Sequence, residues 1–205
     1  YDMQRWWTKE GWQWKHQRRR TQPRFWQDSN YSTDNQPVIG VTWYEATAFC
    51  SWLSEQLQQS LPAGCTVRLP TEAEWEVAAA WDGVQRRPSP WGKVEPTPEL
   101  AIYNALQLDA PAPVGCCPAG VAACGALDLV GNTWEWTCSA YGAYPKQAYN
   151  GREDFTPGEY GLALRGGSYY QNSTSVRCGA RSRSNPLNYV DYFGFRMIVA
   201  SALAR

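Results

Sequence analysis

The middle of this sequence reads DLVGNTWEW from Asp128 to Trp136, and its end alternates large apolar and polar side chains. Alternation with a period of two residues is typical of a strand that turns one face to a core. Two later segments have the same character: residues 162–170, interrupted by the pair Gly166-Gly167, and residues 193–200, which alternate and then become continuously apolar. We therefore expect three short strands in the second half of the chain.

The first half of the chain carries two helix signals. The segments TWYE and TEAE, which begin at Thr42 and Thr71, both place a Thr three positions before a Glu. This is the capping-box pattern of a helix start. In the first case apolar residues follow at helical spacing, so we expect helices that end near Gln59 and Ala80.

Long parts of the chain show neither signal. Residues 1–40 are expected to be mostly loop with one short helix, and residues 93–125, which contain five Pro, a long ordered loop. The predicted fold class is therefore α+β, with two helices, short antiparallel strands and much irregular chain.

The charges of the chain balance, with 19 Lys and Arg against 19 Asp and Glu. A net charge of zero argues against the global basic field that nucleic-acid-binding proteins use. No segment approaches the run of about eighteen apolar residues that a membrane-spanning helix needs. We therefore expect neither a nucleic-acid nor a membrane partner.

The chain has one His, twelve Trp and seven Cys. The single His16 lies in the basic run 15–20, where we expect a solvated surface, and a single His excludes a metal site built from a cluster of His side chains. Buried Trp needs a partner for its N–H group, so twelve Trp predict a core of hydrogen-bonded indoles or an aromatic surface. The absence of any CxxC pair argues against a structural zinc site.

Five segments stand in order along the chain: QPVIGVTWYEA (36–46), RLPTEAEWE (68–76), DLVGNTWEW (128–136), LRGGSY (164–169) and GFR (194–196). Together they resemble the signatures of the formylglycine-generating-enzyme, or sulfatase-modifying-factor, family over nearly the whole chain. The resemblance implies a C-type-lectin-like fold and one domain over residues 1–205. This domain lacks the family's N-terminal segment, which a missing part of the same protein would supply. The Trp residues of these motifs are then expected to be framework: Trp43, Trp75, Trp134 and Trp136.

The resemblance also bears on catalysis. The family's oxidases hold copper with two Cys shortly after the GGSY motif, where this chain has Gln171, and Cys178 fits a structural position of the family instead. The related iron-dependent sulfoxide synthases use a cluster of His ligands, and this chain has one His. We therefore expect no copper, no iron and no enzymatic activity.

Residues 168–192 contain five Ser, four Tyr and three Asn, with Arg interleaved. This composition is typical of a recognition surface, because Tyr gives large contact area and Ser and Asn give adaptable hydrogen bonds. Glycine-containing motifs hold the segment at both ends, as a frame holds a binding loop. The pattern resembles the variable proteins of diversity-generating retroelements, so residues 168–192 are the candidate variable binding region.

The resulting hypothesis is a noncatalytic ligand-binding protein whose variable surface takes a protein or another macromolecule. The alternatives are a nonvariable, noncatalytic domain of a larger bacterial signalling protein and a copper-dependent formylglycine-generating oxidase. The expected binding positions are Tyr169, Tyr170, Gln171, Asn172, Ser173, Ser175, Ser182, Ser184, Asn188, Tyr189, Asp191 and Tyr192.

The family resemblance further implies a calcium site around the DLVGNTWEW turn. The matching ligands are the side chains of Asp128 and Glu135 and the carbonyls of Gly131 and Thr133. Such hard oxygen donors suit Ca²⁺. The alternative is that Glu135 is hydrogen-bonded to the backbone or paired with an Arg.

The family's secreted members use two disulfides, and Cys50 and Cys178 match one half of each. The partner positions hold Met197 and about Ala79, so neither bridge is expected. Missing disulfides favour a reducing compartment, and we expect a cytoplasmic protein. Two readings of the other thiols stay open. The cysteines of the 93–125 loop (Cys116, Cys117 and Cys124) could pair locally, or all seven Cys could be free.

Overall fold

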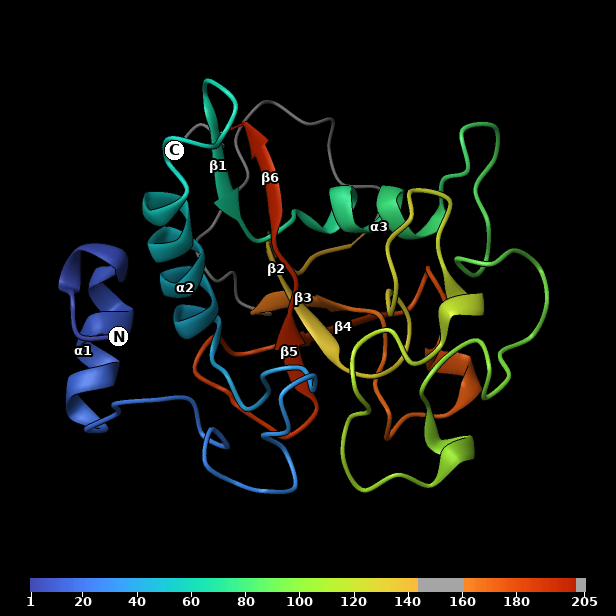
Figure 1. Cartoon of the computed structure of the whole chain (residues 1–205), viewed down its shortest axis with the longest axis horizontal. Coiled ribbons are helices and arrows are strands. Elements are labelled where there is room, and N and C mark those ends of the chain that lie inside the picture. The colour runs from blue at the N-terminus through green and yellow to red at the C-terminus, as the bar shows by residue number, and fades with distance from the viewer. Residues whose placement is uncertain (144–160, 202–205) are drawn as a thin grey trace.

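The computed structural model describes residues 1–143 and 161–201 (Figure 1). Three α-helices lie in the first half of the chain and most strands in the second, which confirms the α+β class. The helices are α1 (Lys9–Gln17), α2 (Trp43–Gln56) and α3 (Glu72–Ala80). The strands are β1 (Cys65–Arg68), β2 (Trp134–Ala140), β3 (Leu162–Arg165), β4 (Arg181–Ser184), β5 (Phe193–Phe195) and β6 (Ile198–Ser201).

Both predicted capping boxes are present. Thr42 accepts a hydrogen bond from the Glu45 N–H and the Glu45 carboxylate accepts one from the Thr42 N–H, and Thr71 and Glu74 make the same pair. These bonds satisfy N–H groups that a helix start leaves without partners. The helix α2 ends at Gln56, slightly before the expected residue, and the short helix expected in residues 1–40 is α1. No helix in the described ranges is long and apolar enough to cross a bilayer.

The strands form two sheets. A four-stranded sheet has the order β4-β3-β2-β5, and a separate pair joins β1 to β6. The expectation of antiparallel strands was wrong in one place, because β2 and β5 run parallel. The last predicted strand is also divided. The strand β5 ends before Arg196, whose side chain donates to the buried Glu135 carboxylate. The next strand, β6, belongs to the other sheet.

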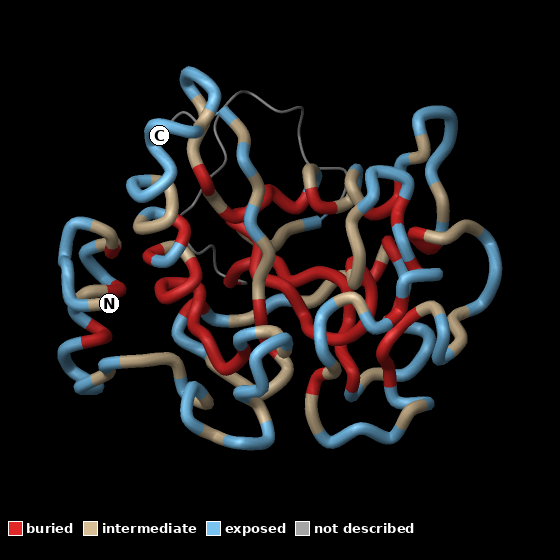
Figure 2. The backbone as a smooth tube through the Cα atoms, in the orientation of Figure 1, coloured by how far each residue is buried: buried red, intermediate tan, exposed pale blue. Residues whose placement is uncertain are grey.

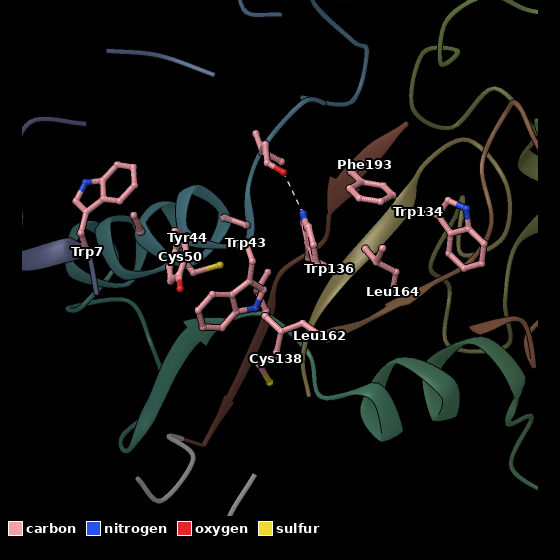
Figure 3. Packing of buried hydrophobic residues seen from close by; sticks show 14 of the residues in the cluster. Trp7, Trp43, Tyr44, Cys50, Trp134, Trp136, Cys138, Leu162, Leu164 and Phe193 are labelled. Atoms are coloured by element: carbon pink, nitrogen blue, oxygen red, sulfur yellow. Dashed lines mark hydrogen bonds between the residues drawn. The ribbon is translucent and has the colours of Figure 1, made fainter. Parts of the chain in front are cut away.

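The core lies between α2 and the four-stranded sheet, where buried residues concentrate (Figure 2). Trp43, Trp136 and Leu162 pack there with Leu164 (Figure 3). The Trp136 indole N–H donates to the Val41 carbonyl at 3.0 Å. The predicted core of hydrogen-bonded indoles is confirmed. All four predicted framework Trp are buried: Trp43, Trp75, Trp134 and Trp136.

No disulfide links the cysteines of the described residues, and Cys116, Cys117 and Cys124 do not pair. The buried Cys178 thiol donates a hydrogen bond to the Ala79 carbonyl at 3.2 Å. The Ala79 carbonyl is therefore adjacent to Cys178, whose thiol is free and hydrogen-bonded.

Candidate functional site

A pocket of about 490 Å³ opens between two irregular segments of the chain. One wall comes from the polar loop that contains Asn30, Tyr31 and Gln36, and the other is the Pro-rich loop 108–113. Neither wall contains a helix or a strand. The position of each wall therefore depends on the residues that pack behind it.

Two predicted residues lie near this pocket but do not line it. Tyr169 follows β3 after the Gly166-Gly167 turn, and Tyr192 precedes β5, so both lie near the start of β2, the strand between β3 and β5. The turn needs Gly167, because its φ is +78° and a Cβ there would lie 2.5 Å from the Ser175 carbonyl oxygen. The Tyr192 carbonyl accepts the Trp134 N–H at 2.9 Å, which ties the segment before β5 to β2.

Tyr169 is the buried centre of the site. It is 3% exposed and packs with Ile102 and Cys117 in a small apolar cluster, against which Ala112 of the pocket wall and Tyr192 also pack. Burial raises the pKa of Tyr169, and the negative charge of Asp191 adds to the rise. The Tyr169 phenol therefore stays protonated and neutral at physiological pH.

Tyr31, which lines the pocket, also has a raised pKa. Burial raises its pKa, followed in size by the charges of Asp191, Asp28 and Asp109 and by a hydrogen bond to Asp191. Tyr31 and Asp109 also contribute to the raised pKa of Tyr169. The charges of Asp109 and Asp191 thus raise the pKa of both phenols, and Tyr192 packs against the Tyr169 cluster. We call these five residues the tyrosine–aspartate site: Tyr31, Asp109, Tyr169, Asp191 and Tyr192.

Tyr192 of this site stacks on the exposed Tyr170. The rings of Tyr170 and Tyr192 stack with centroids 6.1 Å apart and planes 14° apart, and Tyr170 is 69% exposed. Aromatic ring faces and carboxylates both attract cations. The chemistry of the tyrosine–aspartate site therefore favours a ligand that carries a positive charge.

The twelve predicted binding residues do not form one surface. Tyr169, Asp191 and Tyr192 lie in the tyrosine–aspartate site, with Tyr170 at its border. Gln171 and the residues Asn172, Ser173 and Ser175 form the turn that follows. Ser182 and Ser184 lie on β4, the opposite edge of the sheet from β5, and the Asn188 side chain donates to the Ser184 hydroxyl at 2.9 Å. Tyr189 packs against Trp14 of α1.

Two residues of the site were not predicted from the sequence. Tyr31 and Asp109 lie in loops of the first half of the chain, far in sequence from residues 168–192. Neither belongs to a motif or a periodic segment. Their only sequence signal is membership of long polar or Pro-rich loops, which does not indicate a particular residue.

The two carboxylates expected to bind calcium, those of Asp128 and Glu135, have other partners. The Glu135 carboxylate accepts two hydrogen bonds from Arg196, at 2.6 and 2.7 Å, and one from the Trp75 indole at 2.6 Å. A second carboxylate, that of Asp128, accepts the Gly115 N–H at 2.7 Å. N–H groups of Arg196 and Trp75 thus surround the Glu135 carboxylate, and this environment does not fit Ca²⁺. The geometry is that of the alternative, in which an Arg pairs with Glu135.

This arrangement predicts the response to calcium removal. Because Arg196 supplies the positive charge next to Glu135, we expect the melting temperature to be the same in excess EGTA and in millimolar CaCl₂. Differential scanning calorimetry measures this directly. A lower melting temperature in EGTA, restored by Ca²⁺ and not by Mg²⁺, would contradict the ion-pair interpretation.

No group of three or more His, Cys, Asp or Glu side chains suited to a metal ion occurs among residues 1–143 and 161–201. The single His16 is exposed, as expected, and its ring lies 4.4 Å from that of Trp12.

An α+β domain with these sheets and long pocket-bearing loops is a C-type-lectin-like domain. The family model described as "Sulfatase-modifying factor enzyme 1-like domain" matches residues 1–201, and the chain belongs to this family.

Curated relatives include three hercynine oxygenases that are 35–36% identical to this chain. The one from Mycobacterium tuberculosis is 35% identical over 215 residues, which cover 96% of this chain and 47% of the relative. Formylglycine-generating enzyme from Mus musculus is 29% identical, over 93% of this chain and 50% of its own length. Treponema denticola variable protein 1 superposes with a TM-score of 0.66 at 21% identity, over 92% of this chain and 80% of that chain, which shows a likeness of fold.

These relatives correct the functional prediction. Proteins that match 96% of this chain are named hercynine oxygenases, and an oxygenase is an enzyme. The expectations of a noncatalytic variable protein, of no enzymatic activity and of neither copper nor iron are therefore wrong. The physical reason for the wrong prediction is that the chain corresponds to only part of the relatives' length. Counts of His and Cys test only a metal site that lies within these residues, and the chain spans about half the length of the relatives it matches.

Proposed function

We propose that this chain is the sulfatase-modifying-factor-like domain of an oxygenase that acts on hercynine. The observation that carries the proposal is the 35–36% identity to hercynine oxygenases over 96% of the chain. Because the chain spans 45–47% of those relatives, the reaction is proposed for a whole protein of which this domain is a part.

The proposed role of this domain is to bind and orient the substrate. Tyr31 and Asp109 line the pocket, and Asp191 is a hydrogen-bond partner of Tyr31. An aromatic ring with two carboxylates beside it favours a cationic group there. The described residues do not fit a metal centre, so we assign the oxygenase metal to residues outside them and derive no step of the reaction through it.

Substitution of Asp191 tests this proposal. We expect the full chain to bind hercynine in isothermal titration calorimetry and the D191N variant to bind it about ten-fold more weakly, which corresponds to about 1.4 kcal/mol. The reason is that D191N removes a negative charge and leaves the shape of the side chain nearly unchanged. Tetramethylammonium serves as a second probe, for the cation preference alone, and its binding should be weakened in parallel.

The matched control is D34N. Asp34 is an exposed carboxylate of the same charge and lies outside the pocket lining. Its substitution should leave both affinities unchanged. Absence of hercynine binding to the wild-type chain, or equal affinities of D191N and D34N, would overturn the proposal.

A further inference from the structure

The pocket wall from Leu108 to Val114 has no regular secondary structure. It contains Pro111 and Pro113, which have no N–H group to donate to a neighbouring strand. Side-chain amides hold it instead. The Gln36 amide donates to the Pro111 carbonyl at 2.8 Å, and the Asn35 amide donates to the Val114 carbonyl at 3.1 Å.

Asn132 makes the most complete of these contacts. Its Oδ1 accepts the Ala112 N–H at 2.9 Å, and its Nδ2 donates to the Ala112 carbonyl at 3.1 Å. The carboxamide thereby satisfies both backbone groups of one residue of the wall. Asn132 is 2% exposed, so water does not compete for these bonds.

The backbone of Asn132 contacts the other side of the site. Its N–H donates to the Ile102 carbonyl at 2.8 Å, and its carbonyl accepts the Tyr169 N–H at 2.9 Å. Its φ is +60°, a left-handed conformation that Asn adopts more readily than most residues. One residue therefore connects the pocket wall with the buried tyrosine of the tyrosine–aspartate site.

We propose that Asn132 is a positioning residue that sets the distance between the 108–114 wall and Tyr169, and thereby the affinity of the pocket for its ligand. The side chain does not line the pocket and acts through Ala112. Only the identity of the ligand rests on the proposed function. The positioning itself can be tested without any ligand.

The test uses N132D in the full chain. Asp has nearly the same shape as Asn and also tolerates the left-handed conformation, but its carboxylate cannot donate to the Ala112 carbonyl. Hydrogen exchange followed by mass spectrometry should show at least about ten-fold faster exchange in a peptide covering 108–114, because the local opening free energy governs exchange. Peptides from β2 and β3 should keep the wild-type rate, and hercynine affinity should fall about ten-fold.

The same substitution at Asn104 is the matched control, because Asn104 is exposed and its side chain makes no hydrogen bond to the wall or to Tyr169 within the described residues. N104D should behave as wild type in both measurements. If N132D does not fold, Q36A loosens the same wall from its partly exposed side and should accelerate exchange in the same peptide.

Unchanged exchange of 108–114 in N132D would overturn the proposal, and so would acceleration spread equally over β2 and β3, which is the signature of a general loss of stability. Wild-type affinity of a loosened N132D for hercynine would also overturn it. If wild-type protein does not bind hercynine, the proposed function fails while the exchange result alone decides the role of Asn132.

Discussion

Substitution of Gly131 by Ala is expected to lower the free energy of unfolding by roughly 3–5 kcal/mol. Two effects add. The φ of Gly131 is +82°, which strains a side-chain-bearing residue, and a Cβ there would lie 2.3 Å from the Ile102 carbonyl oxygen. That oxygen belongs to a backbone held by Asn132, so it cannot move aside without loss of a hydrogen bond. Urea denaturation followed by far-UV circular dichroism measures the difference.

The matched control is G125A. Gly125 has a φ of +86°, nearly the same backbone conformation, but apart from its chain neighbours no atom lies within 4 Å of the position that a Cβ would take. The free energy of unfolding of G125A should fall only by the cost of backbone strain, about 1–2 kcal/mol. Equal losses in G131A and G125A would show that the contact with Ile102 does not matter and that backbone strain explains the whole effect.

Removal of the Glu135 carboxylate in E135A should also cost about 3–5 kcal/mol, because it leaves the Arg196 charge without a partner in a largely buried position. The side chains of Arg196 and Glu135 are 24% and 6% exposed. The guanidinium keeps only the carbonyls of Leu127 and Asp128, at 3.1 and 3.0 Å. The Trp75 indole loses its acceptor as well. Urea denaturation again gives the change in unfolding free energy.

Glu55 offers a control with the same chemistry on the surface. Its carboxylate accepts hydrogen bonds from Arg5, at 3.0 and 2.7 Å, and from the Trp6 indole at 2.6 Å. The two side chains of this ion pair are 55% and 39% exposed. E55A should therefore leave stability nearly unchanged, because water replaces the lost partner. A similar loss in E55A and E135A would contradict the view that burial makes the Glu135 network important.

The starts of α2 and α3 were predictable to the residue. Both capping boxes form at Thr42 and Thr71 because the Thr and Glu of each box satisfy one another within a single helical turn. The strands β1 and β4 were not predicted. Each is four residues long, and its sequence, CTVR or RSRS, carries little apolar alternation, so pairing with β6 or β3 stabilises it.

The functional residues divide in the same way. All these residues belong to the segment 168–192 that composition marked as a binding surface. Tyr169, Asp191 and Tyr192 lie in the tyrosine–aspartate site, whereas Ser182, Ser184 and Tyr189 lie away from it. The reason is that residues 168–192 leave the site along β4 and return before β5. Composition cannot distinguish residues on the two edges of a sheet.

By itself the sequence determined the helix starts, the framework Trp residues and, through motifs in a fixed order, the family and its fold. These depend on bonds within one turn or on motifs that remain legible along the chain. Tertiary structure alone decided that Tyr31 and Asp109 join Tyr169, that Arg196 pairs with Glu135, and that Asn132 holds the pocket wall. Such contacts join loops distant in sequence. They arise from packing around the sheet, which leaves no periodic trace in the order of the residues.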